Sequence, residues 1–84
     1  MRLADAQLHF LHLEAAACST HVRIAQNTNS QSQRELAMRN AFQAYATVQA
    51  HLPKARLSKE ERVSFERWLK QTAIDLNALF AEPS

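Results

Sequence analysis

The chain contains no glycine, and its only prolines are Pro53 and Pro83. Glycine and proline are the strongest local breaks in regular structure, so their absence elsewhere leaves long stretches in which a helix can continue. Residues 3–25 are also rich in Leu and Ala, which favour helix. Apolar residues make up 46% of the sequence, which is too many for a disordered chain. The sequence therefore predicts an all-α fold.

Three helices are predicted, over about residues 3–25, 33–52 and 59–80. The polar segment 26–32 separates the first two, because Asn and Ser side chains compete for backbone hydrogen bonds. Pro53 ends the second helix, since proline disfavours helical backbone in the residue before it. Ser32 with Glu35, and Ser58 with Glu61, match the capping box that begins a helix.

The two connections are short, which favours antiparallel neighbours and an up-down-up three-helix bundle. We expect residues 1–84 to form one domain. Apolar residues recur at spacings of three and four along the second and third helices. The predicted core residues are Met38, Ala41, Tyr45, Val48 and Leu52 with Phe42 alongside, and Phe65, Leu69, Thr72, Leu76 and Leu79 flanked by Trp68 and Phe80.

The first predicted helix carries two apolar stripes, centred roughly 150° apart on its surface. The first stripe consists of Leu3, Ala6, Phe10, Leu13, Ala17, Thr20 and Ile24. The second stripe is Ala4, Leu8, Leu11, Ala15, Cys18, Val22 and Ala25. One three-helix core does not easily bury both stripes, because a helix that is apolar on two sides needs neighbours on two sides.

We expect Leu3, Phe10, Leu13 and Ile24 to face the bundle core. The second stripe then faces either a partner or a central packing position within the bundle. If it faces a partner, the contact residues are Leu8, Leu11, Ala15, Cys18 and Val22. An 84-residue chain with one cysteine forms no internal disulfide, so self-association is the expected source of added stability. The predicted function is therefore a non-enzymatic interaction module that forms a homodimer or binds a helix of another protein.

A nucleic-acid-binding domain is the alternative, because cations gather between residues 54 and 70. The candidate contacts are Lys54, Arg56, Lys59, Arg62 and Lys70. Three glutamates are interleaved with these cations, and the formal net charge of the chain is only +2. No clear helix-turn-helix pattern accompanies them. The basic segment therefore supports this alternative less strongly than the two stripes support protein binding.

Two pairs of side chains resemble metal-binding spacings, His9 with His12 and Cys18 with His21. Each pair is three residues apart on one helix, but His9 and Cys18 are half a turn out of phase, so the four do not converge. Cys18 has His21 as a neighbouring base but no residue to orient it and no oxyanion donor. We therefore assign no catalytic residue, metal, cofactor or small-molecule ligand, and we expect the protein not to be an enzyme.

No apolar run approaches the roughly 20 residues that a membrane-spanning helix needs. We therefore expect no transmembrane segment, and we expect the protein to reside in the cytoplasm.

Overall fold

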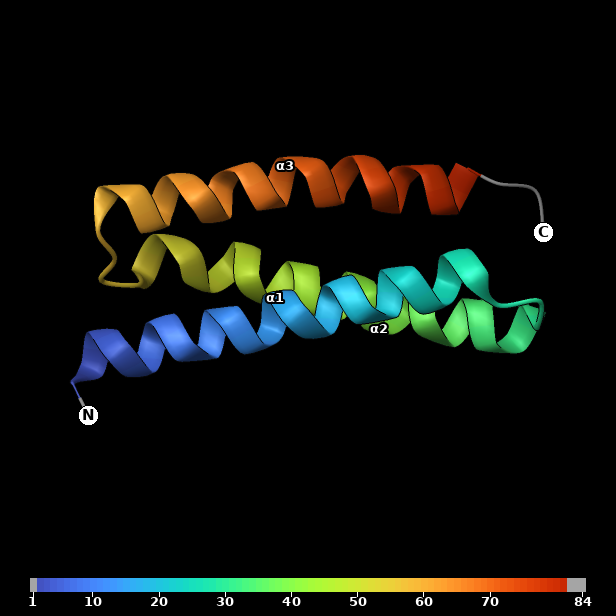
Figure 1. Cartoon of the computed structure of the whole chain (residues 1–84), viewed down its shortest axis with the longest axis horizontal. Coiled ribbons are helices and arrows are strands. Elements are labelled where there is room, and N and C mark those ends of the chain that lie inside the picture. Colours follow the sequence, from blue (N-terminus) through green and yellow to red (C-terminus); the bar gives the residue numbers. More distant parts are fainter. Residues whose placement is uncertain (1, 82–84) are drawn as a thin grey trace.

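The computed structural model describes residues 2–81, which form three long α-helices and one short 3₁₀-helix. They are α1 (Leu3–Asn27), α2 (Gln31–His51), η1 (Leu52–Lys54) and α3 (Lys59–Ala81). Figure 1 shows that α1 and α3 run in the same direction and that α2 runs against both. The predicted all-α three-helix bundle is confirmed.

The start of α2 differs from the prediction by two residues. The N-cap is Ser30 rather than Ser32, and its hydroxyl accepts a hydrogen bond from the backbone N–H of Gln33 at 3.3 Å. Ser30 and Gln33 have the spacing of a capping box, but the reciprocal bond is replaced by Thr28: the Ser30 backbone N–H donates to the Thr28 hydroxyl at 3.2 Å, and that hydroxyl donates to the Gln33 side-chain oxygen at 3.0 Å. Ser32 lies inside the first turn, so the helix begins at Gln31.

The start of α3 agrees with the prediction. The backbone N–H of Glu61 donates to the Ser58 hydroxyl at 3.1 Å, and the backbone N–H of Ser58 donates to the Glu61 carboxylate at 2.8 Å. Each side chain satisfies a backbone donor that has no partner within the helix. The capping box at Ser58 is confirmed.

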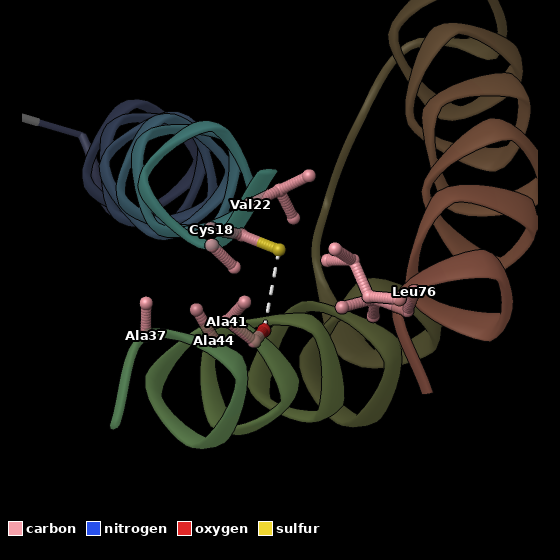
Figure 2. Close-up of a cluster of buried hydrophobic side chains, with 8 residues drawn as sticks. Cys18, Val22, Ala37, Ala41, Ala44 and Leu76 are labelled. Carbon is pink, nitrogen blue, oxygen red and sulfur yellow. Dashed lines mark hydrogen bonds between the residues drawn. The ribbon is translucent and has the colours of Figure 1, made fainter. Parts of the chain in front are cut away.

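Small side chains form the contact between α1 and α2. Figure 2 shows Cys18 and Val22 of α1 against Ala37, Ala41 and Ala44 of α2, with Leu76 of α3 completing the cluster. The Cys18 thiol donates a hydrogen bond of 3.2 Å to the backbone carbonyl of Ala41. A side chain as short as cysteine reaches the partner backbone only where two helices approach closely. The small residues make that approach sterically possible.

Larger side chains of α3 cover this pair of helices. The buried residues on α3 are Phe65, Thr72, Leu76 and Leu79, and Leu69 is half-buried, as the spacing on the third helix predicted. On α2, Ala41 and Val48 are buried, Leu52 is buried in η1, and Met38 and Tyr45 are half-buried against the core. Ala37 and Ala44 belong to the core although the predicted set omitted them. Phe42 and Phe80 are exposed.

The predicted orientation of the first helix is wrong. Leu11, Ala15, Cys18, Val22 and Ala25 are buried inside the bundle, so the second stripe is the core face of α1. Of the two alternatives for the second stripe, packing within the bundle is the correct one, but α1 is not buried on both sides because the first stripe is exposed. The reason is steric complementarity: Ala15, Cys18 and Ala25 match the small face of α2, whereas the bulkier first stripe would hold the two helices apart.

Candidate interaction surface

The first stripe of α1 is exposed along the length of the helix. Its four large side chains keep substantial solvent contact, with exposed fractions of 62% for Leu3, 40% for Phe10, 57% for Leu13 and 43% for Ile24. Ala6, Ala17 and Thr20 lie between them and are also exposed. Exposed apolar residues that occur singly are ordinary, whereas a row of this kind is a candidate binding surface.

Contacts with the C-terminal part of α2 position one end of the stripe. The ring of Phe10 meets the ring of His51 edge-on, with centroids 5.3 Å apart. This contact holds the aromatic ring against the bundle while leaving it 40% exposed.

A shallow hollow of about 310 Å³ borders the middle of the stripe. It is lined by α1 and α2 alone, and no residue of α3 takes part. The lining residues are Glu14, Ala17, His21, Asn40, Gln43, Ala44 and Thr47. The stripe therefore runs beside a groove of the α1–α2 pair that α3 does not fill.

The residues predicted to contact a partner occupy the core instead. Leu11, Ala15, Cys18 and Val22 are buried, and Leu8 is half-buried against the same core. Leu11 and Ala15 belong to one core cluster and Cys18 and Val22 to another, so four of the five residues have almost no surface exposed to a partner. The matching rows of small residues on the first two helices were the sequence signal for this arrangement.

The cations of the nucleic-acid alternative do not share one role. Lys54, Arg56, Lys59 and Lys70 are exposed. Arg62 is half-buried, and its guanidinium donates to the carbonyls of Leu52 at 3.0 Å and Ala55 at 2.8 Å. This side chain therefore closes the connection between α2 and α3.

The environment of Cys18 argues against nucleophilic chemistry. Its side chain has an exposed fraction of 0%, and burial raises the pKa of the thiol to about 11. A neutral buried thiol behaves as a small apolar side chain.

Among residues 2–81, no three His, Cys, Asp or Glu side chains are grouped to hold a metal ion. The His12 ring instead packs against Phe65, with centroids 5.0 Å apart.

A second apolar surface, which the sequence did not reveal, lies between α2 and the last turn of α3. Phe42 and Phe80 meet edge-on there with ring centroids 6.4 Å apart, and they are 52% and 56% exposed. Their helical spacing predicts that both lie on or beside the core. The spacing was a poor guide because each lies just outside the buried face of its helix.

No family model matches this chain, and no similar curated protein or solved structure was found. Within the part of the chain that the structure describes, none of the helices has the length and apolar character needed to span a membrane.

Proposed function

We propose that the protein is a non-enzymatic interaction module that pairs with a second copy of itself through the first stripe of α1. This moves the proposed contact surface to the side of α1 opposite the one that the sequence indicated. The observation that carries the proposal is the exposure of Leu3, Phe10, Leu13 and Ile24 in one row.

The spacing of the stripe supports helix pairing. Its seven positions alternate intervals of three and four residues, which keeps them on one side of a helix along its length. The large side chains are interspersed with the smaller Ala6, Ala17 and Thr20. A row of projections and gaps of this kind accommodates the same row on a second helix, and a two-fold axis brings identical surfaces together.

The small size of the domain gives pairing an energetic benefit. Each of the four large side chains has already lost about half of its solvent contact, so full burial contributes roughly 1 kcal/mol for each. That sum is comparable to the whole stability expected of a small domain. We also propose that this association takes place in the cytoplasm, as expected from the sequence.

Sedimentation equilibrium over about 10 µM to about 1 mM protein tests the proposal. We expect a monomer–dimer equilibrium for the wild type and a monomer for Leu13→Asp, because the carboxylate would have to be buried in the paired surface. Ile74→Asp is the matched control, since Ile74 is 62% exposed on α3 and lies outside the stripe. A wild-type protein that stays monomeric at the highest concentration would contradict self-pairing.

Nucleic-acid binding stays the alternative prediction, with Lys54, Arg56, Lys59 and Lys70 as exposed candidate contacts. Glu66 lies on the same side of α3 as Lys59 and Lys70, which weakens the local attraction for phosphate. Retention on DNA or RNA that falls steeply with salt concentration would favour this function over self-pairing.

A further inference from the structure

The groove between α2 and the end of α3 has the shape and lining of a site for a small amphiphilic molecule. Its volume is about 690 Å³, within the range of small-molecule sites. Met38, Phe42, Leu79 and Phe80 provide its apolar surface. The two phenylalanine rings meet edge-on and remain more than half exposed, so part of their apolar surface is accessible to a ligand.

Polar side chains at the rim of the groove carry more positive than negative charge. Among the described residues that line it, Arg34 and Arg39 are the cations and Glu35 is the acidic residue. The Glu35 carboxylate accepts a hydrogen bond of 3.0 Å from the side-chain amide of Gln31, which directs it along α2. The Arg34 guanidinium donates to the Leu79 carbonyl at 3.3 Å and is thereby held at the boundary between the two helices.

We propose that this groove binds an amphiphilic anion, a molecule that joins a carboxylate to an aliphatic chain. The chain lies against Phe42, Phe80 and Met38, and the carboxylate lies beside the Arg39 guanidinium at the rim. Arginine suits this role because its planar donors match the two oxygens of a carboxylate. This site is separate from the first stripe, so it adds a ligand to the proposed function rather than depending on it.

The extent of the groove favours a small ligand over a partner helix. Among residues 2–81, Leu79 and Phe80 are the α3 residues that line it, and both lie in the last described turn of that helix. A partner helix lying along α2 would have apolar residues on both walls for one turn only. An alkyl chain of about ten carbons contacts both walls over that turn, about 5.4 Å, and continues along Met38 and Phe42 of α2 beyond it.

Calorimetric titration with decanoate tests the proposal, together with decanol as the uncharged analogue of the same chain length. We expect one decanoate per chain and binding of decanol that is at least about tenfold weaker, because the charged hydrogen bond is lost. Arg39→Glu should weaken decanoate binding by about tenfold or more, since it replaces attraction with repulsion. Phe42→Ala should weaken both ligands by about tenfold, because it removes one apolar wall.

Two matched variants control for general effects. Arg67→Glu makes the same charge change at an exposed site on α3, and Ile74→Ala truncates an exposed apolar side chain outside the groove. Both should bind decanoate within about twofold of the wild type. Circular dichroism will verify that each variant is folded, which we expect because Arg39 and Phe42 are exposed. Equal binding of decanoate and decanol, or Arg39→Glu and Arg67→Glu proteins that bind decanoate alike, would overturn the proposal.

Discussion

The thiol of Cys18 is fully enclosed between α1 and α2, where it donates to the Ala41 carbonyl. Burial raises its pKa from 9.0 to about 11. Between these values the unfolded chain loses the thiol proton while the folded chain keeps it, so the unfolded state gains stability as the pH rises. The contribution of this thiol to folding is complete below pH 9.0 and is lost as the pH approaches 11.

Urea unfolding of the wild type and of Cys18→Ala at pH 8 and pH 10.5 measures this contribution. We expect the free energy of unfolding of the wild type to fall by about 2 kcal/mol relative to Cys18→Ala between the two pH values. All other titrating groups are common to both proteins and cancel in the comparison. If the difference in free energy of unfolding between the two proteins is the same at both pH values, the burial of the thiol is contradicted.

Ser30 caps α2, and the nearby Ser32 does not. Replacing Ser30 with Ala removes the hydroxyl that accepts from the Gln33 backbone N–H, so we expect a loss of about 1 kcal/mol in the free energy of unfolding. Ser32→Ala, two residues further along, should change that free energy by less than about 0.5 kcal/mol. Thermal unfolding of the two variants checks the difference, and equal losses would mean that the helix begins elsewhere.

At the scale of the elements, the close approach of α1 and α2 depends on residues with small side chains. Ala41 has an exposed fraction of 0%, so Ala41→Leu has no space for its added methyl groups. We expect that variant to lose about 1–3 kcal/mol, by separating the helices or distorting their side chains. Ala50→Leu is the control, because Ala50 is exposed on the same helix. If chemical denaturation gives both variants the wild-type stability, the close contact is not present.

The guanidinium of Arg62 helps to hold the connection between α2 and α3. Arg62 donates to the carbonyls of Leu52 and Ala55, and a glutamine in its place does not reach both. We expect Arg62→Gln to lower the free energy of unfolding by about 1.5–3 kcal/mol, the range for hydrogen bonds to a charged group. Arg56→Gln changes an exposed arginine in the same region and should have little effect. Similar unfolding curves for the two variants would show that the two hydrogen bonds of Arg62 do not contribute to stability.

Sequence patterns predicted the helices better than they predicted which faces the helices bury. Pro53 and the Ser58–Glu61 pair act locally. They therefore predicted the end of α2 and the start of α3 to within a residue. The burial of α1 depends instead on the face that α2 presents to it. Leu3 and Leu13 are individually more apolar than Ala15 and Cys18. The smaller residues are buried because they fit against the row of alanines on α2. The same limit applies to Phe42, which contacts Phe80 of another helix and stays exposed.

The whole molecule is a pair of closely packed helices covered on one side by a third. This arrangement leaves the first stripe of α1 about half exposed along residues 3–24, and it turns the second stripe inward. The proposed self-pairing and the orientation of α1 are therefore linked: the stripe is available to a second copy only if the opposite face is the core.

Leu11 and Leu13 test that orientation most directly, because they are two residues apart on α1 and are 1% and 57% exposed. The same substitution to Ala at both positions gives variants whose helix propensities match, and urea unfolding of dilute monomer compares them. We expect Leu11→Ala to lose about 2–5 kcal/mol, as for a cavity in a packed core, and Leu13→Ala to lose less than about 1 kcal/mol. A larger loss for Leu13→Ala than for Leu11→Ala would place the first stripe in the core and contradict the account.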